Sequence, residues 1–269
     1  MDIGYTPASP HLAFAGAPAD GSHRRPAVIL CLAVAVITVA LLPFAAASGP
    51  VLPGFILINQ TALVVAYGLS AWVLFAQFRR SRSVALLLIA GGTLYTAAIV
   101  ALQLLSFPGV VANGRVLGAG PQTTTWLWTF WHLGPPLCTL AYAAAIRHGQ
   151  PRLVRSERVR AAALIAAMSG LAAAGAAAAI STLGLTWLPD QVTGDDYAAL
   201  TSSGVGPCVQ VLTLVALAAV WRTTHTRRTV LEVWIAASLA LLVLDNILTM
   251  AGSARGSGNP DFKHGASGM

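Results

Sequence analysis

Long apolar segments, each nearly free of charged residues, recur along this chain and restrict what it can fold into. They cover residues 27–47, 55–78, 83–106, 123–146, 161–182, 205–221 and 229–250. A helix rises about 1.5 Å per residue, so segments of this length can cross a hydrocarbon layer about 30 Å thick. Only 9% of the residues are charged, against about 25% in a soluble domain, and this scarcity excludes a soluble globule.

Lipid offers the backbone no hydrogen-bonding partner, so apolar segments of this length must fold as helices. The sequence therefore predicts an all-α, polytopic transmembrane helical bundle with seven spans. We expect an N-terminal tail at 1–26, the bundle at 27–252 and a Gly/Ser-rich tail at 253–269. The fifth segment is dominated by Ala and Gly, which let helices approach closely, so it is expected to be the buried helix.

Basic residues are distributed unevenly along the chain. Of its 16 Lys and Arg residues, 13 lie in the N-terminal tail and in the second, fourth and sixth connectors. The positive-inside rule then places the N-terminus in the cytoplasm, and the acidic loop at 183–204 and the C-terminal tail outside. We interpret these arginines as topology signals that contact anionic membrane lipid, and expect no nucleic-acid partner.

Ionisable groups inside a span are costly, and three are present, at His132, Glu232 and Asp245. Glu232 falls close to the cytoplasmic end, where we expect it to anchor beside Arg227 and Arg228. By helical rise, His132 lies about 13 Å and Asp245 about 8 Å below the outer ends of their spans. Their depths are compatible with a contact.

Three glutamines also fall in the outer half of the bundle, at Gln60, Gln103 and Gln210, and Trp131 adjoins His132. Polar side chains from five helices could converge on one cavity for a small molecule or an ion. The alternative is that each polar group satisfies a neighbouring helix. The residue set of this hypothesis is His132, Asp245, Gln60, Gln103, Gln210 and Trp131.

Other site chemistries are poorly supported by the sequence. Haem held by two histidines needs a second intramembrane histidine, and the other five lie in tails or loops. Cys31, Cys138 and Cys208 are far apart and are interpreted as packing residues, so we expect no metal and no cofactor. Ser169 could pair with His132 as in an intramembrane protease, but no nucleophile-elbow pattern surrounds it.

The middle of the chain resembles a known family. The residues that carry the resemblance are Phe107-Pro108-Gly109, Leu117-Gly118-Ala119-Gly120, Gln122-Thr123, Trp126-Leu127, and Trp131-His132 with Gly134, Pro136 and Leu137. Supporting positions are Gln60-Thr61-Ala62, Gln77-Phe78, and Leu244-Asp245 followed by Gly252. Over residues 55–255 the sequence is similar to the fourth type of membrane-associated sensor domain, of the MASE group.

This resemblance implies a sensory role. Such domains are usually the N-terminal input modules of bacterial diguanylate cyclases and histidine kinases, with undefined ligands. It implies a sensor of the bacterial inner membrane. The sequence shows no cyclase or kinase signature motif, and its tail is expected outside, so we expect a non-catalytic chain that signals to a separate cytoplasmic protein. In the family the chain normally continues into an eighth helix and an output domain, so we expect a truncated or frameshifted sensor, or a stand-alone input unit. A small-solute transporter or channel is the alternative function, and a membrane-embedded enzyme is a third.

Overall fold

The computed structural model describes residues 16–45, 54–107, 119–147, 152–192, 199–223 and 228–256. Several residues used in the sequence predictions lie outside these ranges: Pro108, Gly109, Leu117, Gly118, Arg227, part of the acidic loop and most of the Gly/Ser-rich tail.

Seven helices of 19 to 27 residues make up most of the described chain. They are α1 (Gly21–Leu41), α2 (Phe55–Ser81), α3 (Val84–Ser106), α4 (Pro121–Ile146), α5 (Val159–Leu183), α7 (Val205–Thr223) and α8 (Val230–Gly256). A four-residue helix, α6 (Ala199–Ser202), and the 3-10 turns Leu42–Phe44, Ser156–Arg158 and Leu185–Trp187 lie between them. Each long helix corresponds to one predicted segment, which confirms the all-α class.

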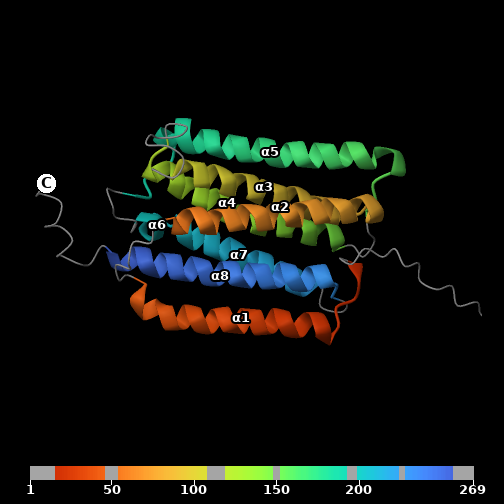
Figure 1. The fold of residues 1–269 in the computed structure, drawn as a ribbon, viewed down its shortest axis with the longest axis horizontal. Helices are drawn as coiled ribbons and strands as arrows, with labels where there is room; N and C mark the ends of the chain where they lie inside the picture. The colour runs from red at the N-terminus through yellow and green to blue at the C-terminus, as the bar shows by residue number, and fades with distance from the viewer. Residues whose placement is uncertain are drawn as a thin grey trace, which may run out of the picture.

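Successive long helices run in opposite directions, so α1 begins at one end of the bundle and α8 finishes at the other (Figure 1). The connectors that carry arginines meet at the end where α1 begins. There the backbone N–H of Ala19 donates to the carbonyl of Arg228 at 2.8 Å, and that of Val84 donates to the carbonyl of Arg152 at 2.9 Å. The predicted clustering of basic connectors at one end is therefore present, and we call this the basic end.

Among the described residues, six helices are long and apolar enough to cross a membrane: α1, α2, α3, α5, α7 and α8. The seventh long helix, α4, falls outside that set although it has 26 residues. It carries Gln122, several threonines and His132 among its apolar residues. A helix of this character avoids lipid if other helices surround it, and α3, α5, α7 and α8 all pack against α4.

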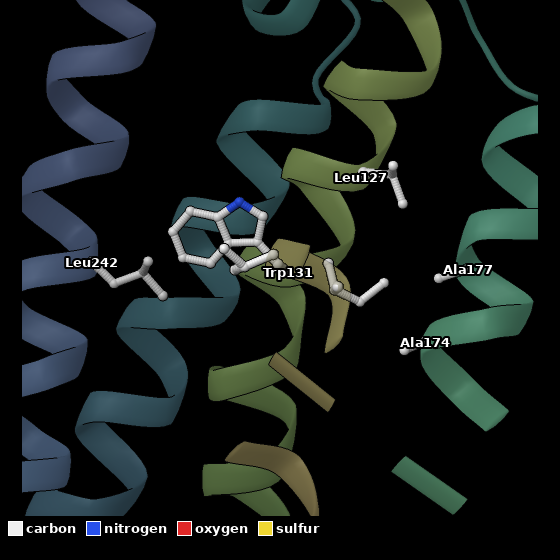
Figure 2. Packing of buried hydrophobic residues seen from close by; sticks show 7 residues of the cluster. Leu127, Trp131, Ala174, Ala177 and Leu242 are labelled. Carbon is white, nitrogen blue, oxygen red and sulfur yellow. The ribbon is translucent and has the colours of Figure 1, made fainter. Parts of the chain in front are cut away.

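The core of the bundle lies around α3 and α4. One cluster of buried side chains joins Ile99 and Val100 of α3 to α4, α5 and α8. In Figure 2, Leu127 of α4 lies on the side of Ala174 and Ala177 of α5, whereas Trp131 extends toward Leu242 of α8.

The expectation that the fifth segment is the buried helix is wrong. More than half of the apolar window of α3 is buried (56%), against 17% for the segment that contains α5. Alanine is apolar enough for lipid and small enough for a helix contact, so an Ala-rich sequence does not distinguish the two environments.

The first helix begins at Gly21, six residues before the predicted span. Asp20 explains this start, because its side chain accepts a hydrogen bond from the backbone N–H of Ser22 at 2.9 Å and so caps the helix. Hydrogen bonds from the Ser22 side chain and backbone also lower the pKa of the Asp20 carboxyl. Arg24 and Arg25 consequently lie in the first turns of α1.

Small residues allow α3 and α5 to approach closely at one point. A Cβ atom at Gly170 would lie 2.8 Å from the carbonyl oxygen of Gly91, which is too close for any side chain. Neither backbone can retreat without losing the contacts around it.

We predict that Gly170→Leu lowers the free energy of unfolding by about 1–3 kcal/mol, because it forces these two backbones apart. Ala172→Leu, at an exposed position of the same helix, is the matched control and should change little. Thermal unfolding of the purified protein in detergent, followed by helical circular dichroism, measures both. Equal stability of the two variants would contradict the close packing of α3 on α5.

Candidate functional site

His132 lies on α4 and is completely buried. Its Nδ1 atom is 2.8 Å from the carbonyl oxygen of Trp128, one helical turn earlier, and its Nε2 atom is 2.9 Å from Oδ2 of Asp245 on α8. A carbonyl oxygen can only accept a hydrogen bond, so Nδ1 carries a hydrogen. The predicted contact between the ionisable groups of the fourth and seventh spans is therefore formed.

The contact between Nε2 and the carboxylate also contains a proton. Two bare acceptors would repel each other at 2.9 Å, so either His132 is an imidazolium or Asp245 is protonated. In both cases one proton is shared between α4 and α8. A ligand that competes for the carboxylate would break this link between the two helices.

Two indole rings of the same helix enclose the imidazole. The ring centroids of Trp128 and Trp131 lie 3.9 Å and 3.7 Å from that of His132. Both rings therefore pack directly against the imidazole. Trp131, included among the predicted site residues, thus belongs to the pair's immediate surroundings.

The two partners of the pair differ in exposure. The side chain of Asp245 is 52% exposed, whereas that of His132 is 0% exposed. Tyr67 of α2 is close enough to interact electrostatically with Asp245. A ligand would therefore reach the pair from the carboxylate side.

A second polar group joins α2, α3 and α4. Gln60 donates from Nε2 to Oε1 of Gln103 at 3.4 Å, and Gln103 donates from Nε2 to the carbonyl of Thr124 at 3.3 Å. Ser106 and Thr124 share a further hydrogen bond of 2.9 Å. The structure thus brings two of the three predicted glutamines together, but within the described residues no hydrogen bond joins them to the His132–Asp245 pair.

The third glutamine, Gln210, lies on α7. Gly206 of α7 lies beside Met250 of α8, since a Cβ atom at Gly206 would lie 3.2 Å from the Sδ atom of Met250. The two helices are antiparallel, so four residues forward on α7 correspond to four residues back on α8. Gln210 is therefore level with Asn246. Gln210 and the predicted pair are therefore at similar depth, on helices that pack against one another.

Several buried polar atoms in this region have no hydrogen-bond partner within the described residues. They are Nε1 of Trp131, Oε1 of Gln210, both amide atoms of Asn246, Oε1 of Gln60 and Nε2 of Gln191. Buried polar atoms normally have partners, so these donors and acceptors mark unused binding capacity. Trp131 directly precedes His132 in the chain, and Asn246 directly follows Asp245. With Gln210 they supply two donors, the indole N–H of Trp131 and the amide N–H of Asn246, and two acceptors, the amide oxygens of Gln210 and Asn246.

Asn246 is a candidate that sequence reasoning missed. It is 1% exposed, but it is uncharged, and the sequence predictions singled out the ionisable groups of the apolar segments. Its position beside Asp245 was the available signal, because two successive polar residues inside a span cannot both face lipid cheaply.

The connector after α5 closes the end of α4 that lies opposite the basic end. The Gln122 side chain donates to Oδ1 of Asp190 and to the carbonyl of Val192, both at 2.9 Å, and accepts from the backbone N–H of Gln191 at 3.0 Å. Thr129 donates to Oε1 of Gln191 at 3.2 Å, one turn from His132. The sequence indicated only an acidic loop here, and the buried Gln191 was not predicted.

Glu232 is placed differently from the prediction. One of its carboxylate oxygens accepts from the hydroxyl of Tyr142 at 2.9 Å, and the other accepts from the backbone N–H of Thr229 at 2.8 Å. Within the described residues it forms no ion pair with Arg228, whose guanidinium lies 3.7 Å from the centroid of the Trp221 ring. A buried carboxylate at a helix N-terminus is satisfied by backbone N–H groups and therefore needs no arginine.

Two cavities of the structure lie elsewhere. One, of about 670 Å³, runs along α2 from Leu57 to Leu69, and the other, of about 660 Å³, lies between α1, α7 and α8. Neither is lined by His132, Asp245 or the three glutamines. The predicted residues therefore form packed contacts at α4, and not the wall of either cavity.

Comparison with known families connects this arrangement to sensing. Residues 50–258 match the family model MASE4, described as a membrane-associated sensor, integral membrane domain. Comparisons with curated proteins and with solved structures found no match. The matched region contains α2 to α8, including both partners of the pair, whereas α1 precedes it. The chain, a multi-pass membrane protein by its apolar helices, belongs to the MASE4 family of membrane-associated sensors.

Proposed function

We propose that this chain is a sensory input domain in which a ligand acts on the His132–Asp245 pair. The observation that carries the proposal is the contact of 2.9 Å between the buried His132 of α4 and the half-exposed Asp245 of α8. The family supports the proposal, because its domain is a membrane sensor and is not itself catalytic.

Two polar contacts join α4 and α8, beside the apolar contacts between them. Apart from these contacts, α8 packs chiefly on α1 and α7, and α4 packs chiefly on α3 and α7. Toward the basic end, Tyr142 of α4 donates to Glu232 of α8 at 2.9 Å. The two links are ten residues apart on α4, or about 15 Å along the helix. A change at the outer link can therefore move α8 against α4 at the inner one.

The ligand would be a small molecule or an ion with hydrogen-bonding capacity. Unpartnered atoms of Trp131, Gln210 and Asn246 would bind it between α4, α7 and α8, while competition for Asp245 would release His132. Gln60 and Gln103 would hold α2 and α3 in register with α4. Signalling needs two packings of the bundle for which the ligand has different affinities.

In the proposed topology α4 is a seventh span, shielded from lipid by its neighbours. The N-terminus and the basic end face the cytoplasm, as the positive-inside rule indicates, and the membrane is the bacterial inner membrane. The signal would pass from the basic end to a cytoplasmic signalling protein.

We predict that Asp245→Asn and His132→Ala each lower the free energy of unfolding by about 1–2 kcal/mol, the upper range for hydrogen bonds between membrane helices. In the double variant the two effects should be less than additive, because both remove one contact. Chemical unfolding in detergent micelles measures the coupling. Full additivity would show that the pair does not act as a unit.

A second prediction concerns transmission to the basic end. Spin labels at Ala144 of α4 and Trp234 of α8, both exposed, in a cysteine-free background, report the distance between the inner halves of these helices. We expect Asp245→Asn to change this distance distribution in lipid nanodiscs. Asp190→Asn, which alters a carboxylate of the outer connector, is the control and should leave it unchanged. If Asp245→Asn also leaves it unchanged, the pair does not control the inner end.

Topology can be tested on both sides of α4. Cysteines introduced as Gly120→Cys and Arg155→Cys flank this helix, and a Cβ atom at Gly120 meets nothing within 4 Å. In intact spheroplasts of cells without other reactive cysteines, an impermeant maleimide should label position 120 and should label position 155 only after lysis. Labelling of both positions from outside, or of neither, would refute α4 as a span.

The transporter alternative predicts a different result. A channel or transporter that used the shared proton would carry protons across vesicles containing the protein and an internal pH-sensitive dye, and Asp245→Asn would abolish this flux. The sensor proposal expects no flux above that of empty vesicles.

A further inference from the structure

The cavity between α1, α7 and α8 has a floor of small side chains. Val233, Ala236, Ala237 and Ala240 line it from α8, at spacings that place them on one face of that helix. Cys31 of α1 contacts this floor, with its Sγ 3.9 Å from the carbonyl of Ala237. Because the floor residues are short, α1 and α7 stand above it as walls, and the cavity is an apolar slot of about 660 Å³.

The slot runs along most of one half of a bilayer. From Glu232 to Ala240, both of which line it, α8 advances about 12 Å at helical rise, and Arg228 lies beyond the start of this helix. The hydrocarbon of one leaflet is about 15 Å thick. The slot therefore runs from the basic end to about the middle of the membrane.

The end of the slot is cationic. Arg24 of α1, Arg222 of α7 and Arg228 after α7 line it there. The Arg228 guanidinium lies over the Trp221 ring at 3.7 Å, which holds it at the mouth. Glu232 also lines the slot, and its oxygens accept hydrogen bonds from Tyr142 and Thr229. Three arginines outnumber this single carboxylate, so the mouth is positively charged overall.

From this geometry we propose that the slot binds an anionic phospholipid of the leaflet at the basic end. The phosphate lies among the three arginines, and an acyl chain lies along the alanine floor. Arginine forks suit phosphate oxygens, and a tryptophan belongs at the depth of the headgroups. One molecule that is apolar along its length and anionic at one end matches both the slot and its mouth.

Charge complementarity favours a lipid over a transmembrane helix as the occupant. The three arginines at the mouth match the phosphate of a lipid, whereas an apolar helix offers them no anionic group. This lipid would be shared by α1, which precedes the matched sensor region, and by α7 and α8 within it. Its binding would therefore hold α1 against the sensor domain.

The test measures lipid retained by the full-length protein. The protein is extracted from vesicles of phosphatidylcholine containing one tenth phosphatidylglycerol, and the co-purifying lipids are quantified by mass spectrometry. We expect phosphatidylglycerol to be enriched over its share in the vesicles. Arg222→Gln with Arg228→Gln should reduce the enrichment by about fivefold for each arginine removed. Arg79→Gln with Arg80→Gln, at the end of α2, is the charge-matched control and should leave it unchanged.

Filling the slot provides an independent variant. Ala236→Leu with Ala240→Leu retains every arginine and should abolish the retention of phosphatidylglycerol, whereas Ala172→Leu with Ala176→Leu on exposed α5 positions should not. Circular dichroism verifies that each variant is helical and folded. Three outcomes would each overturn the proposal. The first is an equal loss of phosphatidylglycerol in the Arg79 and Arg80 control, and the second is retention of phosphatidylglycerol by the filled variant. The third is a change only in the fraction of dimer, which would favour a second copy as the occupant.

Discussion

A polar side chain inside a hydrocarbon layer must find its hydrogen-bond partner within the protein. Short side chains find it on their own helix: Thr129 donates to the carbonyl of Thr125, Thr213 to that of Val209 and Ser181 to that of Ala177, each four residues earlier. Histidine, glutamine and carboxylate groups have more atoms to satisfy than their own turn can supply. Most of the partners that they find lie on another helix, and these hydrogen bonds join α2 to α3, α3 to α4 and α4 to α8.

The arrangement of the bundle follows from that requirement. Gln103 joins α3 to α2 and α4, and His132 and Tyr142 join α4 to α8. The helix that carries most of these groups is surrounded, and the helices without them, α1 and α5, lie at the edges (Figure 1). Contacts made by hydrogen bonds can be exchanged for others more readily than interdigitated side chains can repack. A sensor needs such contacts, because its two states must differ by only a few kcal/mol.

The two ends of the bundle are built for different surroundings. At the end opposite the basic end, a connector is tied to α4 through Gln122 and Gln191, and it covers the region of His132. At the basic end one arginine is stacked on Trp221. One end is thus closed over the polar centre, and the other carries the positive charge.

The sequence by itself determined the helices, since the length of an apolar segment and the rise of a helix are fixed quantities. It also placed the basic connectors at one end and set His132 and Asp245 at compatible depths. Only the tertiary structure decided that these two side chains face each other, because segments that are apolar on every side contain no information about rotation around their axes. The same ambiguity hid Asn246 and made Ala-rich α5 look buried, since alanine is equally stable against lipid and against protein.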